Sequence, residues 1–515
     1  MRKQTVVIIS LLSFFVALFF NEYNLHLIRK SNPLNVESNT KSLVQNETIC
    51  SADDVDYLSP VVNVEAGKGW KRSPAVSNDD SYRRTPGYSL LYYAFVKPFG
   101  YAAGHRALKY FQLLLFTISV SLFCFTVFEI TKNKPATILL TLIYGIMPYF
   151  HGWVYFTITE TITPALTVIF LYYLVKAYHV TEVKMKSASY AIASFFLGCL
   201  ILTRPYMAIA GAMLAIFLLY DYYNQEAKRR GVFIKNSILI MLVPLSMVGV
   251  WTVRNYHVAS EIVPLEKRYS PQSLDRMKPE FEGIFSFAKC WGEDGSYFNS
   301  YHQPFYFSSL RGDTGSFYIQ KILAAWPSSV IEEFGYTRLF RILKDHQRAL
   351  LMEKPYFDNH IAMPDRYLPM QINVFNRYKE LIQEYKKNHF LGYWVRTPSI
   401  YLSRMIFHSN TAHLFFFQNN KNNLGMNIFR GLLLFIHVFV YIGLFFNLLF
   451  MKIKLNKFIF VYIPLLLIIF FIVIHREIEQ RYMLPVLPVM LAGSGFALLK
   501  VISTYSKKQA PIAPD

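Results

Sequence analysis

Ten predominantly apolar stretches run along the 515-residue chain and constrain its fold more than any other feature. A helix needs roughly 20 apolar residues to cross the hydrocarbon core of a bilayer. The stretches lie at about residues 5–20, 108–130, 136–149, 161–178, 187–202, 206–222, 233–253, 428–450, 458–474 and 484–502. Charged residues make up only 17% of the sequence, against about 25% in soluble proteins. The sequence therefore predicts an all-α polytopic membrane protein with about ten transmembrane helices.

Lysine and arginine residues gather in the loops after every second stretch, on the same side as the N-terminus. They are Lys132, Lys134, Lys176, Lys184, Lys186, Lys228, Arg229, Arg230, Lys235, Lys452, Lys454, Lys457, Lys507 and Lys508. Because cytoplasmic loops collect such residues, we expect both termini in the cytoplasm and the protein in the cytoplasmic (inner) membrane. No small-x-small cleavage site follows the first stretch, which we interpret as an uncleaved anchor.

This orientation places two long segments on the outer face of the membrane. The predicted organisation is an N-terminal transmembrane module over 1–253, an outer-face (periplasmic) domain over 254–427 and C-terminal transmembrane helices over 428–515. The first outer loop, 21–107, belongs to the N-terminal module. The stretch 397–417 is apolar but interrupted by charged and histidine residues, so we interpret it as an amphipathic helix in the interface. An eleventh span there would break the charge pattern.

Several classes of function are disfavoured. The net charge of +20 is explained by cytoplasmic loops and anionic lipids, and no basic stripe interleaved with aromatic residues suggests a nucleic-acid partner. Apart from His437, the middles of the spans carry almost no ionisable side chain, which argues against an ion-driven transporter. No Gly-x-Gly-x-x-Gly, Walker or His-Glu-x-x-His motif is present. No cofactor or metal is required, although a divalent cation is compatible with the carboxylates of the first loop.

Charged residues gather instead at the outer ends of the spans. The carboxylates include Asp53, Asp54 and Glu160, and the arginines are Arg83, Arg84, Arg204, Arg254, Arg476 and Arg481. The planar guanidinium of arginine suits a phosphate, and a carboxylate beside a hydroxyl can serve as a general base. The set points to chemistry on a lipid-borne phosphate at the outer surface. The alternative for any one residue is a solvated or headgroup-paired charge.

Short motifs in these regions resemble the GT-C class of glycosyltransferases, which take a sugar from a polyprenyl-phosphate donor on the outer or lumenal face. Asp53-Asp54-Val55-Asp56-Tyr57 is similar to the first outer loop of that class, and the segment 83–91 is similar to the Arg-x-Pro-Gly-Tyr-Pro-Leu stretch of its bacterial members. Those members are similar to protein O-mannosyltransferases and lipid A aminoarabinose transferases. Ser89 departs from the usual proline. Further similar stretches follow in the expected order: Thr159-Glu160, Leu202-Thr203-Arg204-Pro205, Arg254-Asn255-Tyr256 and Gln480-Arg481-Tyr482-Met483-Leu484-Pro485. The interior of 265–418 matches nothing in the class.

The resemblance implies roles for these residues. Asp53 corresponds to the catalytic base and Asp54 to the acidic residue often beside it. Arg84, with Arg83 as a second candidate, corresponds to the contact with the lipid phosphate, and Arg481 to an arginine beside it. Arg204 and Arg254 could hold the same phosphate or reach to lipid headgroups. The further site candidates are Tyr57, Asp80, Tyr88, Glu160 and Tyr482. For Asp80, a turn before Arg83 is the alternative.

The implied reaction is an inverting transfer of a sugar from the polyprenyl phosphate to a hydroxyl of a lipid, glycan or protein. Two rivals remain open: a polysaccharide polymerase or ligase with a diphosphate-linked donor, and a lipid or glycan transporter without catalysis. An oxidising outer compartment would also permit a disulfide between Cys50 and Cys290.

Overall fold

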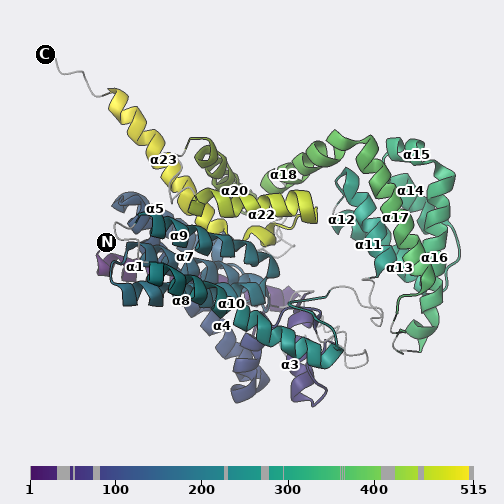
Figure 1. Cartoon of the computed structure of the whole chain (residues 1–515), viewed down its shortest axis with the longest axis horizontal. Coiled ribbons are helices and arrows are strands. Elements are labelled where there is room, and N and C mark those ends of the chain that lie inside the picture. Colours follow the sequence, from purple (N-terminus) through teal and green to yellow (C-terminus); the bar gives the residue numbers. More distant parts are fainter. Residues whose placement is uncertain are drawn as a thin grey trace.

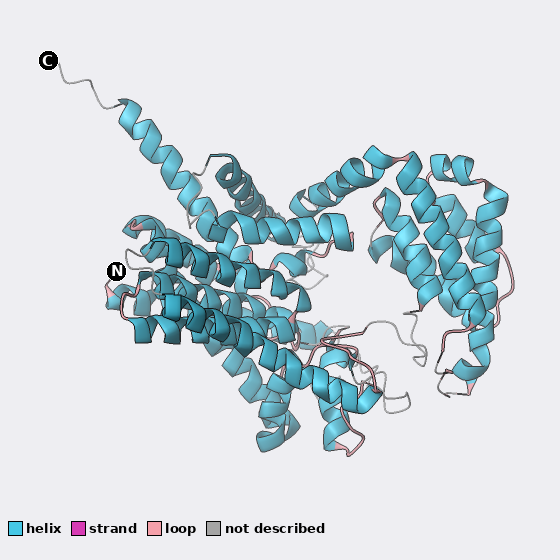
Figure 2. Cartoon of the chain, in the orientation of Figure 1, coloured by secondary structure: helices cyan, strands magenta, loops and turns pink. Residues whose placement is uncertain are grey.

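A computed structural model describes residues 2–31, 47–49, 53–72, 82–224, 230–267, 278–293, 295–359, 361, 363–364, 366–407, 424–450 and 458–509. Within these ranges the chain is helical and has no β-strand, apart from an isolated bridge between Ile49 and Phe156 (Figure 2). The helices divide into two groups, which we call the membrane module and the loop domain (Figure 1).

The membrane module contains the apolar helices, both long and short. They are α1 (Lys3–Ser31), α4 (Gly87–Thr131), α5 (Lys134–Ile146), α7 (Thr163–His179), α8 (Val183–Thr203), α9 (Gly211–Asn224), α10 (Arg230–Ala259), α20 (Leu424–Phe450), α22 (Ile463–Ile469) and α23 (Leu487–Gln509). Short elements lie between them: α3 (Asp54–Glu65), α6 (Pro148–His151), η2 (Thr159–Thr161), η3 (Pro205–Ala210), η8 (Phe458–Tyr462), η9 (Phe470–His475) and η10 (Gln480–Met483).

Seven of the described helices are long and apolar enough to cross a membrane, and three shorter apolar helices accompany them. Each of the ten predicted stretches coincides with one of these helices, so the predicted all-α polytopic fold is confirmed. The helix α4 begins 21 residues before the stretch predicted at 108–130, at Gly87. It is kinked at Gly100, where φ is 72°, a conformation that glycine adopts without steric cost.

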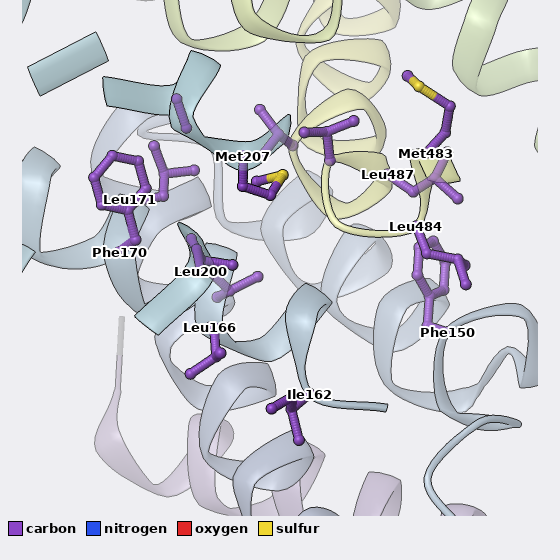
Figure 3. Packing of buried hydrophobic residues seen from close by; sticks show 14 of the residues in the cluster. Phe150, Ile162, Leu166, Phe170, Leu171, Leu200, Met207, Met483, Leu484 and Leu487 are labelled. Carbon is purple, nitrogen blue, oxygen red and sulfur yellow. The ribbon is translucent and has the colours of Figure 1, made fainter. Parts of the chain in front are cut away.

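One hydrophobic core joins the two ends of the sequence in the membrane module. The helix α7 packs against α4 and α8, and α8 packs against α10. The C-terminal α23 packs against α20 and α5. Figure 3 shows side chains from α7, η3 and α23, including Leu166, Met207 and Leu487, in this common core. Because α7 is apolar on nearly every face, it takes the most enclosed position.

The loop domain is a separate helical bundle with its own core. Its elements are α11 (Pro279–Ala288), η4 (Lys289–Trp291), α12 (Gly295–Tyr297), η5 (Phe298–His302), α13 (Gln303–Leu310), α14 (Phe317–Ala325), α15 (Ser328–Phe334), α16 (Tyr336–Asp358), α17 (Pro369–Asn388) and η6 (Gly392–Arg396). The helices α11, α16 and α17 pack together, and aromatic residues such as Phe281, Phe287 and Tyr378 fill the space between them. This bundle lies within the segment predicted as the outer-face domain.

The helix α18 (Thr397–Phe407) leads from the loop domain back to the membrane module, where it contacts α20 and η9 (Figure 1). It covers the first part of the amphipathic helix predicted over 397–417, and the remainder lies outside the described residues.

Cys290 is a buried free thiol, whereas Cys50, its predicted disulfide partner, lies outside the described residues.

Candidate active site

The first turn of α3 gathers three carboxylates at one end of the membrane module. Asp53 is the N-cap residue of this helix, and Asp54 and Asp56 follow in its first turn. Acidic side chains are favoured there because the helix dipole places partial positive charge at the N-terminus. The three side chains leave the helix in different directions and therefore meet different partners.

Asp53 forms an ion pair with Arg481, a residue 428 positions later in the chain. Arg481 also contacts Glu479 and lies 3.4 Å from Glu160, measured from Nε to Oε1. Burial opposes the charge of Arg481, but attraction by these three carboxylates raises its pKa. The side chain of Asp53 keeps 32% of its surface exposed. It is thus held in place by an arginine while remaining open to a second molecule.

Glu160 is the buried centre of this network. Its side chain is 1% exposed and pairs with Arg204 in addition to Arg481. Arg204 lies directly before Pro205, and a residue in that position disfavours the α conformation. The helix α8 therefore ends at Thr203, and Arg204 is extended (φ −142°, ψ 103°) at the rim of the site. A buried carboxylate paired with two guanidinium groups fixes both arginines.

Arg84 approaches from the segment before α4. Its Nε donates to Oδ2 of Asp56 at 3.0 Å, and its guanidinium lies 5.9 Å from the ring centre of Tyr57. Arg72 is a second cation on Asp56, at 2.5 Å from Oδ1. Burial opposes the charge of Arg84, but attraction by Tyr57 and Asp56 raises its pKa. Burial raises the pKa of Tyr57, the phenol beside this arginine.

Asp54 points into the protein. Its carboxylate accepts a hydrogen bond of 2.8 Å from Thr157, and the residue is only 1% exposed. This bond joins α3 to the segment that precedes Glu160. The contact suits a residue that positions the loop better than one that meets a substrate.

A cavity of about 900 Å³ opens next to these charges. Its walls are mostly apolar and come from η3, α22 and η9, with Ile209, Leu466 and Phe471 among them. The polar part of its lining includes Arg84, Arg204, Tyr57, Glu266 and His475. A cavity lined by apolar side chains and two arginines fits an amphiphile with an anionic head, because arginine binds phosphate oxygens through parallel hydrogen bonds.

The structure brings most of the predicted site residues together. Asp53, Tyr57, Arg84, Glu160, Arg204, Arg481 and Tyr482 lie in the ion-pair network or line the cavity. Arg83 lies beside them, in a small pocket with Asp56 and Arg72.

Three predicted residues are elsewhere. Arg254 does not line the cavity and donates to Asn255 and to the carbonyl of Trp70. Tyr88 is buried under Tyr57 and donates to Gln112 at 2.8 Å. Asp80 lies outside the described residues.

Sequence reasoning missed Asp56, Glu479 and Tyr206 as site residues. Asp56 belongs to the acidic first turn of α3 and binds Arg84, whereas Glu479 binds Arg481 from two residues away. Tyr206 lines the cavity and donates to the carbonyl of Tyr482 at 3.1 Å. The available signals were the acidic run shared with Asp53 and Asp54 for Asp56, and the position two residues before Arg481 for Glu479. Tyr206 follows Arg204-Pro205 but carried no signal of its own.

The described part of the chain offers no group of three or more His, Cys, Asp or Glu side chains that could hold a metal ion. Of the carboxylates in α3, Asp53 faces Arg481, Asp54 faces Thr157 and Asp56 faces Arg84.

No family model and no curated protein matches the chain. Solved structures do match. The oligosaccharyltransferase of Archaeoglobus fulgidus, in complex with zinc and sulfate, is 10% identical with a TM-score of 0.44, over 97% of this chain and 50% of that one. This chain thus spans about half the length of that protein. ArnT from Cupriavidus metallidurans bound to undecaprenyl phosphate is 12% identical with a TM-score of 0.34, over 99% and 81% of the two chains. ArnT in the apo state is 13% identical with a TM-score of 0.32, over 92% and 79%.

Proposed function

We propose that this protein is a membrane glycosyltransferase that moves a sugar from a polyprenyl-phosphate donor to a hydroxyl of a lipid, glycan or protein acceptor. The observation that carries the proposal is the 900 Å³ cavity, with apolar walls for a prenyl chain and with Arg84 and Arg204 for its phosphate. The ion pair of Asp53 with Arg481 lies next to it, through Glu160. Apolar walls, phosphate ligands and a candidate base therefore adjoin one another.

In the proposed reaction, the acceptor oxygen attacks the anomeric carbon of the donor and its proton passes to Asp53. The bond between the anomeric carbon and the phosphate oxygen breaks, and the polyprenyl phosphate leaves with the bonding electrons. Preorganised positive charge at the leaving group is often the largest catalytic contribution. Arg84 and Arg204 supply it, and Glu160 and Asp56 hold them in place. Attack opposite the leaving group inverts the configuration.

The acceptor hydroxyl must compete with Arg481 for Asp53, since the two side chains are paired. Arg481 has Glu479 and Glu160 as further partners, so it can keep its charge compensated while one oxygen of Asp53 accepts the proton. We propose that this site lies on the outer face of the cytoplasmic membrane, with both termini inside, as the distribution of basic loops predicts.

The test uses purified protein in detergent with a panel of polyprenyl-phosphate sugars and a membrane extract as the acceptor source. Release of free polyprenyl phosphate is compared between the wild type and Asp53→Asn. Asp358→Asn, an exposed carboxylate paired with Lys354 in the loop domain, is the matched control. The proposal expects release that requires Asp53 and is unchanged in the control.

Consumption of diphosphate-linked donors alone, with Asp53→Asn fully active, would replace the proposal with the polymerase or ligase function. Flux of a lipid or glycan across reconstituted vesicles, unchanged in Asp53→Asn and without transfer, would replace it with transport. Binding of undecaprenyl phosphate to folded protein, tested first, separates an absent acceptor from an absent donor site.

A further inference from the structure

Four large apolar side chains are exposed at the corner where α17 ends and α18 begins. Phe390 is 63% exposed, Leu391 70%, Trp394 44% and Val395 55%. They lie in η6 and directly before it, at positions i, i+1, i+4 and i+5, which places them on one side of a helical segment. We call these four residues the corner patch. A group of exposed apolar side chains of this kind indicates a surface that a partner or a membrane covers.

Trp394 differs from the other tryptophans of the chain, which are all buried or half-buried in the structure. They are Trp70, Trp153, Trp251, Trp291 and Trp326. Burial of a large aromatic ring is strongly favourable, so a ring left in water is a candidate for contact with another apolar phase. Tryptophan is also enriched where a membrane meets water, because its ring is apolar and its N–H is polar.

The corner patch is held at the end of an apolar helix of the membrane module. Arg476 directly follows the apolar segment Ile459–His475. Its Nη2 donates to the carbonyl of Tyr393 at 2.7 Å, and its guanidinium lies 3.3 Å from the centre of that ring. Tyr393 lies between Leu391 and Trp394 in the sequence. The patch is therefore fixed near the level at which an apolar helix gives way to polar residues, which is the level of lipid headgroups.

The chain also connects the patch directly to a membrane helix. The helix α18 begins at Thr397, two residues after Val395, and contacts α20 (Figure 1). The described part of α20 is long and apolar enough to cross a membrane, and its Phe435 and Ile442 are exposed, as expected of side chains that face lipid. Phe407, near the end of α18, is exposed as well. Exposed apolar side chains thus occur at both ends of α18 and on the helix that it contacts.

Cations border the corner patch. Lys387 and Arg396 are exposed, and neither forms an ion pair within the described chain. Lys386 lies 4.9 Å from the ring centre of Tyr393. The neighbouring carboxylate of Glu333 is already paired with a histidine, His389. Apolar side chains with a basic border suit a bilayer surface that contains anionic lipids.

We propose that the corner patch inserts into the bilayer surface on the side of the candidate active site and anchors the loop domain there. Its four apolar side chains would enter the headgroup region, and Lys387 and Arg396 would contact lipid phosphates. A second copy of the chain is disfavoured as the occupant, because a symmetric contact would bring the two basic borders together. The anchor would hold the loop domain against the end of η9, where Ile474 and His475 line the 900 Å³ cavity. This inference concerns the membrane contact and does not depend on the proposed function.

The experiment uses the full-length protein in nanodiscs and the fluorescence of Trp394. Phosphatidylcholine brominated on its acyl chains close to the headgroup quenches a tryptophan that lies in the bilayer surface. Subtracting the signal of Trp394→Phe from that of the wild type isolates this residue from the other five tryptophans. The control is Trp394→Phe/Phe317→Trp, which places an exposed tryptophan on α14, on the side of the loop domain away from the membrane module (Figure 1).

We expect the brominated lipid to quench Trp394 and to leave the tryptophan at position 317 unquenched. In discs that contain phosphatidylglycerol, Lys387→Gln/Arg396→Gln should shift the equilibrium from the inserted to the free patch by up to about thirtyfold, since each cation near an anionic surface contributes about 1 kcal/mol. In pure phosphatidylcholine the shift should be absent. Lys321→Gln/Arg341→Gln, which removes two exposed cations elsewhere on the loop domain, should behave as the wild type in both lipids.

Quenching of Trp394 no stronger than that of the control tryptophan would overturn the inference. If Trp394 is shielded from aqueous acrylamide only in discs that hold two copies, a second copy covers the patch and the membrane contact is wrong. Equal quenching of the wild type and Lys387→Gln/Arg396→Gln in phosphatidylglycerol discs would overturn the role of anionic headgroups. If that variant does not fold, quenching of the wild type with and without phosphatidylglycerol decides the same point.

Discussion

The cavity of about 900 Å³ that we propose binds the donor (the donor cavity) and the second cavity, of about 650 Å³ between the loop domain and the membrane module, use charge in opposite ways. Around the donor cavity, charges from segments far apart in sequence are buried and paired, as in Glu160 with Arg204 and Asp53 with Arg481. In the second cavity, Lys379 and Lys386 come from one helix face, reach solvent and form no ion pair within the described chain. Fixed charges suit stabilisation of a leaving group, since their orientation is settled before the reaction begins. Accessible charges suit recruitment of an ionic substrate.

The largest effect on activity is expected at Asp53, on the side of the donor cavity. Asp53→Asn removes the proposed base and keeps the shape of the side chain, so we expect sugar transfer to fall by about 10²–10⁴-fold. The fall should appear in kcat, because Arg84 and Arg204, the proposed contacts of the donor phosphate, remain. Single-turnover transfer kinetics measure it. Asp54→Asn, which alters a buried bond to Thr157, should instead lower the melting temperature.

Full activity of Asp53→Asn would show that the fixed network is structural and that the base lies elsewhere. A loss of activity with an equal loss of donor binding would also contradict the assignment, because a base acts on the acceptor proton.

Substitution of Glu160 tests whether burial holds the paired charges beside the donor cavity in a fixed position. Glu160→Gln leaves Arg204 buried without its carboxylate, and breaking a buried pair from one side costs about 3–5 kcal/mol. We expect a lower melting temperature in detergent and weaker binding of undecaprenyl phosphate. Glu384→Gln, which breaks the exposed pair with Arg338, should change stability by less than about 1 kcal/mol. Equal effects of the two variants would remove the distinction between buried and exposed pairs.

In the loop domain two buried carboxylates, Glu280 and Glu353, interact with each other, whereas Glu160 is paired with arginines. Burial, with repulsion from Glu353, raises the pKa of Glu280 to about 8, and Lys278 and Gln371 also face this pair. A raised pKa in the folded state means that the stabilising contribution is complete below about pH 4.5 and is lost as pH rises towards 8. Stability should fall over this window by at most about 1.4 kcal/mol per pH unit for one proton.

Glu280→Gln should make the stability of the protein depend less on pH over this window. The measurement is the difference from wild type in the free energy of unfolding by denaturant, for the full chain, between pH 5 and 8. The difference isolates Glu280 from the buried His302 and His346. Burial lowers the pKa of each of these histidines to about 3, so their contribution is lost as pH falls below about 6.5. Parallel profiles for variant and wild type would contradict the raised pKa.

The smallest expected effect is at Asp56, which holds Arg84 without lining the donor cavity. In Asp56→Asn the side chain keeps one acceptor oxygen but loses its charge. We expect undecaprenyl phosphate to bind up to about tenfold more weakly with little change in kcat. Asp56→Glu should restore part of the affinity if the carboxylate orients Arg84. An unchanged affinity in Asp56→Asn would show that the remaining contacts position this arginine.

Most of the fold was predictable because a bilayer leaves few alternatives to helices of about 20 apolar residues. All ten stretches are helical, although α4 extends back to Gly87 and α5 is shorter than a full span. The loop domain was harder to predict, because its helices are stabilised by an aromatic core that gathers residues from 281 to 393. No local pattern specifies which of those residues meet.

The candidate site was likewise predictable from the sequence only in part. The sequence by itself determined that acidic and arginine-rich segments stand at the ends of apolar helices, and motif order singled out Asp53, Arg84, Arg204 and Arg481. Only the tertiary structure decided that Glu160 joins two of these arginines, that Asp54 and Arg254 do not line the first cavity, and that a second basic cavity adjoins it. The physical reason is that apolar length and charge are properties of local sequence, whereas an ion pair across 428 residues depends on how the helices pack.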